Sequence, residues 1–129
     1  MSGEEQDMAA RVLVVDDEPV NVFVLQRLLR HCGLECAVAR NGAEAVEKAT
    51  GAPCDVILMD ISMPVMDGLT AAREIAARLG PSGPAVIAVT ANATAEQRRR
   101  CAEAGFAGFI AKPVRLAALQ AALRGIAAH

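Results

Sequence analysis

The stretch RVLVVDD, residues 11–17, decides the fold class, because an unbroken apolar run rich in β-branched residues ends abruptly in two acids. The stretch VILMD at residues 56–60 has the same form, and FIAKP at residues 109–113 places a lysine after its apolar run. Short continuous apolar runs of this kind are typical of strands buried on both faces of a parallel sheet. Ligands of such sheets bind beyond the carboxyl ends of the strands, so we expect the acids and the lysine to meet at one edge.

Strand and helix patterns alternate along the whole chain. We expect strands at about residues 12–16, 35–39, 56–60, 85–90 and 108–111, and helices at about 19–32, 41–50, 68–79, 94–105 and from 113 to the C-terminus. The alternation predicts one α/β domain over residues 11–129, a doubly wound five-stranded parallel sheet of flavodoxin-like order 2-1-3-4-5 with helices on both faces. Residues 1–10 are polar and acidic, and we expect them to be a disordered leader.

Composition narrows the classes of partner. The chain has 129 residues and a formal net charge of −2, so bulk electrostatics indicates neither a nucleic-acid nor a membrane partner. There is no apolar stretch long enough to span a bilayer and no secretory signal, so we expect a cytoplasmic protein, as a monomer or weak dimer. The four cysteines are scattered, and we interpret them as buried small apolar residues, although the spacing of Cys32 and Cys36 could suit a metal.

The residues after the strands form a chemically consistent set. Asp16, Asp17 and Asp60 can supply oxygen ligands to Mg²⁺, which also relieves the repulsion between carboxylates. Thr90 and Lys112 end the last two strands and offer a hydroxyl and a compact positive charge at the same edge. Such a set could surround a phosphoryl group, with Asp60 as the nucleophile that forms an aspartyl phosphate.

These residues carry a resemblance to a known family. The motifs VVDDEP, LMDISMPVMDG, VTA and AKP, in this order, resemble the receiver domain of response regulators in two-component signalling. The resemblance implies that Asp60 accepts the phosphoryl group, that Asp17 and Asp60 bind Mg²⁺ directly, and that Asp16 acts through water. It further implies a metal contact from the carbonyl of Ser62, phosphoryl contacts from Thr90 and Lys112, a cis Lys112–Pro113 bond, and Phe109 as the switch residue.

Finer features are similar to the receivers of hybrid sensor histidine kinases. They are Asn21, Thr90-Ala91-Asn92-Ala93, Cys101, Ala104-Gly105 and Lys112-Pro113-Val114. The resemblance implies a phosphorelay module whose phosphodonor is a sensor histidine kinase or a histidine phosphotransfer protein. Such a domain catalyses its own phosphorylation and dephosphorylation and is not a multiple-turnover enzyme.

Three alternatives remain open from the sequence. They are an aspartate-nucleophile phosphatase of haloacid dehalogenase type, a flavodoxin-like mononucleotide binder, and a receiver that serves only as a scaffold. Two surface features also have two interpretations each. Arg98-Arg99-Arg100 is either a solvated helix face or a partner site, and an exposed Val22 or Phe23 is either ordinary surface or a docking site for a donor's helices.

Overall fold

The computed structural model of the chain describes residues 11–61 and 68–127, and its centre is a five-stranded parallel sheet. The strand order is β2-β1-β3-β4-β5, which confirms the predicted topology. The strands are β1 (Val12–Val15), β2 (Cys36–Ala39), β3 (Val56–Asp60), β4 (Ala85–Thr90) and β5 (Gly108–Ala111). The expected leader at residues 1–10 lies outside the described residues.

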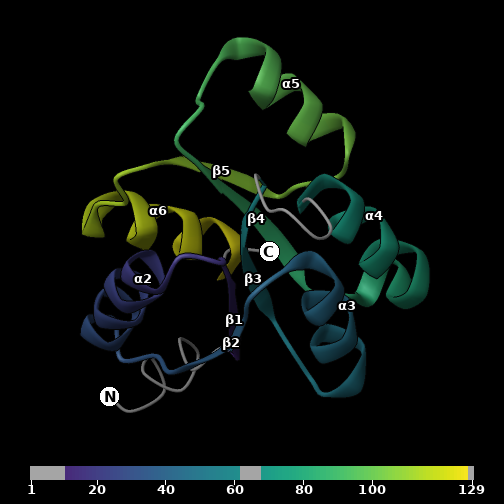
Figure 1. Cartoon of the computed structure of the whole chain (residues 1–129), viewed down its shortest axis with the longest axis horizontal. Helices are drawn as coiled ribbons and strands as arrows, with labels where there is room; N and C mark the ends of the chain where they lie inside the picture. The colour runs from purple at the N-terminus through teal and green to yellow at the C-terminus, as the bar shows by residue number, and fades with distance from the viewer. Residues whose placement is uncertain (1–10, 62–67, 128–129) are drawn as a thin grey trace.

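Helices connect the strands and cover both faces of the sheet (Figure 1). The helices are α2 (Pro19–His31), α3 (Gly42–Gly51), α4 (Gly68–Leu79), the 3₁₀ turn η1 (Gly80–Ser82), α5 (Ala95–Glu103) and α6 (Leu116–Ala127). Asn41 caps α3 by accepting the Glu44 N–H at 2.8 Å, and Thr94 caps α5 by accepting the Gln97 N–H at 3.1 Å.

The C-terminal helix begins later than predicted. We expected it from Pro113, but α6 starts at Leu116. The backbone N–H of Lys112 still donates to the Thr90 carbonyl at 2.8 Å, so the chain continues its pairing with β4 beyond the end of β5. The segment between that bond and α6 therefore belongs to the carboxyl edge of the sheet, where it contributes to the site.

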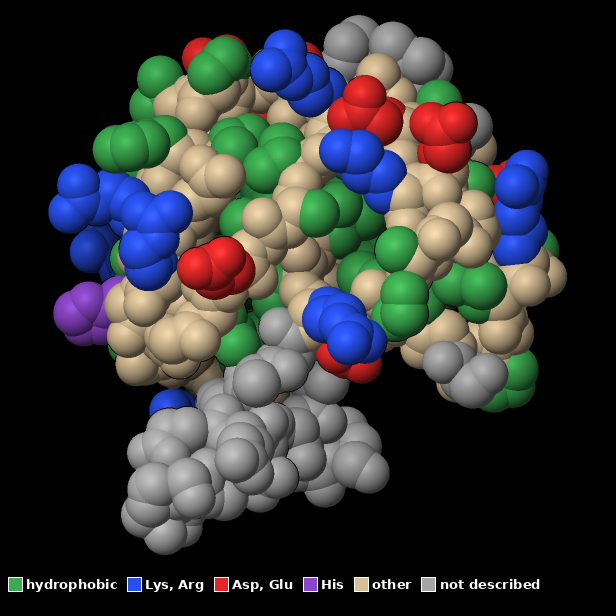
Figure 2. Space-filling view, turned by 90° about the horizontal axis from the view of Figure 1, so that it is seen from below, with side chains coloured by type: hydrophobic (Ala, Val, Ile, Leu, Met, Phe, Trp, Pro, Cys, Tyr) green, Lys and Arg blue, Asp and Glu red, His purple; other side chains and the backbone are tan. Residues whose placement is uncertain are grey.

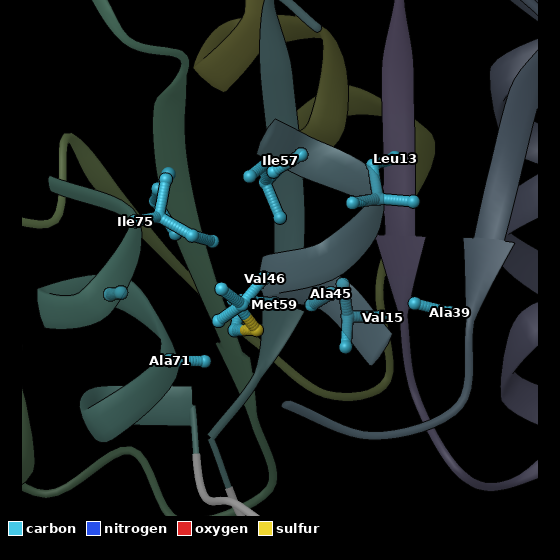
Figure 3. Packing of buried hydrophobic residues seen from close by; sticks show 12 residues of the cluster. Leu13, Val15, Ala39, Ala45, Val46, Ile57, Met59, Ala71 and Ile75 are labelled. Carbon is cyan, nitrogen blue, oxygen red and sulfur yellow. The ribbon is translucent and has the colours of Figure 1, made fainter. Parts of the chain in front are cut away.

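Two apolar layers hold the sheet in place. On one face, α3 and α4 pack Ala45, Val46, Ala71 and Ile75 against Leu13, Val15, Ile57 and Met59 (Figure 3). On the other face, α2 and α6 pack their buried leucines against alternate residues of the same strands. Each central strand is thus buried on both sides, which explains its continuous apolar sequence.

The surface carries no strong charge of one sign on the side drawn in Figure 2, where basic and acidic side chains are interspersed. No helix within the described ranges has the length and apolar character needed to cross a membrane.

All four cysteines are free thiols, and burial raises the pKa of each above its ordinary value. Of the four, Cys101 alone is buried, so the prediction of buried thiols is wrong for the other three, which are partly exposed.

Candidate functional site

The ends of β1 and β3 place three carboxylates together. Val15 of β1 pairs in register with Met59 of β3, so Asp16 and Asp60 follow at the same level of neighbouring strands. Oxygen atoms of Asp16, Asp17 and Asp60 all lie within 4.8 Å of one another. Asp16 and Asp60 are only 1% and 6% exposed, whereas Asp17 is exposed. Two nearly buried carboxylates and one open to solvent therefore share the edge of the sheet.

Lys112 brings a positive charge to the same point. Its Nζ atom lies 3.2 Å from Oδ2 of Asp16 and 3.5 Å from Oδ2 of Asp60. The lysine reaches this position because its backbone N–H continues the pairing with β4, as described above. One ammonium among three carboxylates leaves two negative charges without compensation. A divalent cation would balance that excess.

The two neighbouring acids differ in how their oxygens are engaged. Oδ1 of Asp16 accepts the backbone N–H of Glu18 at 2.9 Å, and Oδ2 of Asp16 faces the Lys112 ammonium. Within the described part of the chain, the Asp17 carboxylate has neither a hydrogen bond nor an ion pair. Asp17 is thus the acid of this pair that can turn both oxygens toward a cation, while Asp16 is held by the protein.

The acid cluster fits a Mg²⁺ ion. Mg²⁺ binds oxygen at about 2.0–2.1 Å in an octahedron, so opposite ligands lie about 4.2 Å apart. Oxygens within 4.8 Å of one another can reach that geometry through small side-chain rotations. The predicted carbonyl ligand Ser62 lies outside the described residues.

Thr90 sits at the end of β4 with its side chain 1% exposed. Its Oγ1 accepts the backbone N–H of Asn92 at 3.0 Å. A threonine hydroxyl can accept and donate at once, so the Thr90 proton remains available to an oxygen placed at the strand ends. Thr90 lies one residue beyond Val89, which pairs with Asp60 in register.

Phe109 lies within β5, two residues before the end of that strand. It is partly buried in β5 and packs against a small cluster of Ile61, Leu69, Ala88 and Cys101. The Arg98 guanidinium lies over the Phe109 ring, with its central carbon 4.5 Å from the ring centroid. The predicted switch role of Phe109 remains a prediction. The Lys112–Pro113 peptide bond is cis, as the resemblance implied.

Gly68, which the sequence patterns did not single out, shapes the backbone beside the site. A Cβ atom at Gly68 would lie 2.7 Å from the backbone oxygen of Asp60 and 2.7 Å from Cα of Ile61. Side-chain atoms essentially never approach backbone this closely, so only glycine lets α4 begin beside the end of β3. A glycine at the first position of a predicted helix was the available signal, because glycine weakens a helix unless close packing requires it.

An apolar patch adjoins the site at the start of α2. Val20, Phe23 and Val24 are 65%, 56% and 41% exposed. A small cavity of about 100 Å³ connects Val24 with Lys112 and Pro113. The prediction that Val22 or Phe23 is exposed is confirmed by Phe23, whereas Val22 is partly buried and packs against the core beneath α2.

Other hollows lie away from these residues. An apolar cavity of about 620 Å³ opens near Val12, Leu34 and Cys36, at the amino ends of the strands. The acids are at the opposite ends of the same strands. This cavity therefore has no part in the chemistry of the carboxylates.

Comparisons with known proteins agree with this geometry. The sequence profile of the response regulator receiver domain matches residues 12–124. The chain is 40% identical over 112 residues to the sensor histidine kinase RcsC of Salmonella typhi. The aligned stretch covers 87% of this chain but only 12% of that kinase. The chain thus spans about an eighth of the length of this relative.

Two solved structures share the fold. One is the receiver domain of sensor histidine kinase PA1611 from Pseudomonas aeruginosa, with a magnesium ion in its active-site cleft. It has a TM-score of 0.85 and 37% identity, covering 94% of this chain and 99% of that one. The other is a co-crystal structure from Saccharomyces cerevisiae of the phosphotransfer protein Ypd1 and the receiver domain of Ssk1. It has a TM-score of 0.78 and 29% identity, covering 87% of this chain and 84% of that one.

Proposed function

Because the chain belongs to the response regulator receiver domain family, we propose that it accepts a phosphoryl group from a phosphohistidine onto Asp60. One observation carries this proposal. The Asp60 carboxylate is nearly buried at the strand edge, with Asp16 and Asp17 beside it and the Lys112 ammonium 3.5 Å away. A carboxylate held in this way can act as a nucleophile toward phosphorus, and the positive charge nearby stabilises the product that it forms.

The transfer conserves atoms and charge in a single displacement. A carboxylate oxygen of Asp60 forms a bond to phosphorus while the bond from phosphorus to the imidazole nitrogen of the donor breaks. The donor imidazole carries a proton on its other ring nitrogen, so it leaves as neutral imidazole when the bonding electron pair stays on the nitrogen that held phosphorus, and no further proton is needed. Lys112 stays beside the transferring oxygens as a fixed positive charge, and the Thr90 hydroxyl donates to one of them.

The metal has a defined place in this proposal. We assign Asp17 and Asp60 as direct ligands of Mg²⁺ and Asp16 as an acid that acts through water, with Ser62 contributing its carbonyl. The engaged oxygens of Asp16 and the exposed carboxylate of Asp17 support this division. When bound, Mg²⁺ supplies positive charge to the phosphoryl oxygens. The magnesium ion described for the PA1611 receiver supports the choice of metal.

The apolar patch of Val20, Phe23 and Val24 is the proposed docking surface for the donor. Exposed apolar side chains that adjoin a reacting site are typical of surfaces covered by a partner. Two features suit a helical histidine kinase domain or a histidine phosphotransfer protein: the patch lies on α2, and the cavity beside it reaches Lys112. The relationship to RcsC and the Ypd1–Ssk1 complex support this class of partner.

The proposed domain is a signalling module rather than a multiple-turnover enzyme. We expect one phosphoryl group per chain after incubation with a phosphorylated histidine phosphotransfer protein and Mg²⁺. We also expect no continuing release of phosphate from p-nitrophenyl phosphate. Many turnovers on that ester would instead indicate a phosphatase of haloacid dehalogenase type.

A further inference from the structure

Helices α2 and α6 carry basic side chains but no acidic ones. The two helices cover the same face of the sheet and share one apolar layer (Figure 1). Neither the sequence of α2 nor that of α6 contains an aspartate or a glutamate. Their outer surface instead holds four exposed arginines, which we call the arginine face: Arg27 and Arg30 on α2, Arg115 directly before α6, and Arg124 on α6.

The charges of the arginine face are not compensated within the described part of the chain. None of its four side chains forms an ion pair with a carboxylate there. On other helices arginines do find partners, since Arg78 pairs with Glu74 at 3.0 Å and Arg99 pairs with Glu103 at 3.4 Å. A chain of net charge −2 thus gathers unpaired cations on one face, and such a local field attracts anionic surfaces.

Arg27 joins the arginine face to the apolar patch of α2. The central carbon of its guanidinium lies 5.7 Å from the centroid of the exposed Phe23 ring. Attraction between the cation and the ring holds the guanidinium in place, while its N–H donors remain free to bind a carboxylate with two parallel hydrogen bonds. Phe23 and Arg27 are four residues apart and lie on the same side of α2. They therefore offer a partner one combined apolar and cationic contact.

The sign of the charge changes along α2. Asp17 and Glu18 precede the helix, at the carboxyl edge of the sheet. At about 1.5 Å per residue, Arg27 lies about 12 Å from the start of α2, and Arg124 lies about the same distance from the start of α6. An acidic side chain of a partner is thus repelled beside the acid cluster and attracted farther along both helices. This arrangement favours one orientation of a charged partner over the other.

We propose that the arginine face binds acidic side chains of the phosphohistidine donor, at positions about two to three helical turns from the donor's histidine. The position of the histidine over Asp60 rests on the proposed function, whereas binding of an acidic helical surface does not. Charges at the margin of an interface act mainly on the association rate and on the choice of partner. The arginine face therefore selects among donors that present the same histidine chemistry.

The test uses a histidine phosphotransfer domain prepared in two versions. They differ at exposed positions two to three turns from the histidine, which carry glutamate in one version and lysine in the other. The receiver chain is compared as wild type, as the double variant Arg27→Glu with Arg124→Glu, and as Arg73→Glu. Arg73 is the matched control, because it is exposed on α4, which packs on the opposite face of the sheet. All three positions are exposed and glutamate is a good helix former, so we expect the variants to fold.

The measured quantity is the rate of phosphoryl transfer at a low concentration of the phosphorylated domain. In about 0.01 M salt, the glutamate version should phosphorylate wild type about two- to twentyfold faster than the lysine version, as expected for two exposed ion pairs. The double variant should prefer the lysine version, and Arg73→Glu should keep the preference of wild type. In about 1 M salt the preference should vanish. Equal rates of the two versions with wild type, or a preference that Arg73→Glu also reverses, would overturn the proposal.

Two further measurements separate this proposal from the proposed function. Acetyl phosphate with Mg²⁺ reports the chemistry at Asp60 without a docking surface, so absence of labelling of wild type would reject the proposed function. An NMR titration with the two unphosphorylated versions then decides the role of the arginine face. The side-chain Nε–H signals of Arg27 and Arg124 should shift with the glutamate version and not with the lysine version, and equal responses to both would reject the proposal. Equal responses together with binding to vesicles of anionic phospholipid, lost in the double variant, would assign this face to a membrane instead.

Discussion

Lys112 and Asp16, which are 96 residues apart in the chain, form a closer charge pair than Lys112 and Asp60 do. The Nζ atom lies 3.2 Å from the Asp16 oxygen and 3.5 Å from the Asp60 oxygen. The ammonium thus stands between the ends of β1 and β3 and lowers the repulsion between their carboxylates. It also competes with any cation that uses the same oxygens.

The position of Lys112 gives the first prediction. In Lys112→Ala, Mg²⁺ should bind at least as tightly as in wild type, because a competing positive charge is gone. Phosphorylation by acetyl phosphate should nevertheless slow by on the order of a hundredfold, the usual effect of removing one preorganised charge or donor. Isothermal calorimetry and intact mass spectrometry measure the two effects. Lys48→Ala, at the other lysine of the chain, is the control, and a variant at Lys112 that labels as fast as this control would contradict the assignment.

The second prediction concerns Asp16 and Asp17, whose carboxylates differ in their hydrogen bonds and ion pairs. Asp17→Asn should weaken Mg²⁺ binding more than Asp16→Asn, because the Asp17 carboxylate is exposed and Asp16 is held by Glu18 and Lys112. A residue that acts on a metal through water typically contributes about 10–100-fold to the metal affinity. Asp16→Asn should therefore lower the affinity for Mg²⁺ by about 10-fold, the lower end of that range. Calorimetry with MgCl₂ compares the variants directly. The reverse order of affinities would mean that the ligand roles are exchanged.

The close approach of α4 to β3 gives a prediction on stability. Gly68→Ala should lower the free energy of unfolding by about 1–3 kcal/mol, because its Cβ would overlap the backbone of Asp60 and Ile61. Gly125→Ala is the matched control, since Gly125 lies in α6 and has open space where a Cβ would be added. That substitution should raise stability by about 0.5–1 kcal/mol, the difference in helix propensity. Urea titrations followed by circular dichroism would show both, and equal stability of the two variants would refute the packing argument.

The apolar patch on α2 gives a prediction on the partner. Phe23→Ser should slow phosphoryl transfer from a phosphorylated histidine phosphotransfer protein but leave labelling by acetyl phosphate unchanged. The reason is that Phe23 is 56% exposed and lies outside the acid cluster, so it can affect docking without affecting the chemistry. Glu47→Ser is the control, because Glu47 is exposed on α3, which packs on the opposite face of the sheet. Slower phosphorylation with both phosphodonors would mean that Phe23 affects the chemical step itself. An unchanged rate with both would mean that α2 is not part of the docking surface.

The sequence was sufficient for features that depend on local patterns. Apolar runs placed Asp16, Asp60 and Lys112 at the ends of β1, β3 and β5, because buried parallel strands are continuous in hydrophobicity and their polar residues fall at the ends. The caps at Asn41 and Thr94 also depend on a local pattern, because each side chain binds a backbone N–H within four residues in the sequence.

Features that depend on packing between distant segments were not accessible from the sequence. The need for glycine at position 68 arises from the backbone of Asp60 and Ile61, and the stacking of Arg98 on Phe109 joins α5 to β5. Val22 is partly buried because of the way α2 packs on the core. When a helix has apolar residues on most of its sides, the sequence does not specify which side packs inward. The pairing that keeps Lys112 in the sheet before α6 begins likewise joins two distant residues, Lys112 and Thr90.

The central claim is that Asp60 is the residue phosphorylated, and intact mass spectrometry tests it most directly. Wild-type protein and Asp60→Asn are incubated with acetyl phosphate and Mg²⁺, and each mass is compared with that of its untreated sample. Asparagine keeps the size of the side chain but has no carboxylate oxygen to attack phosphorus. The wild type should gain the mass of one phosphoryl group and Asp60→Asn should gain none, whereas equal labelling of the two proteins would contradict the account.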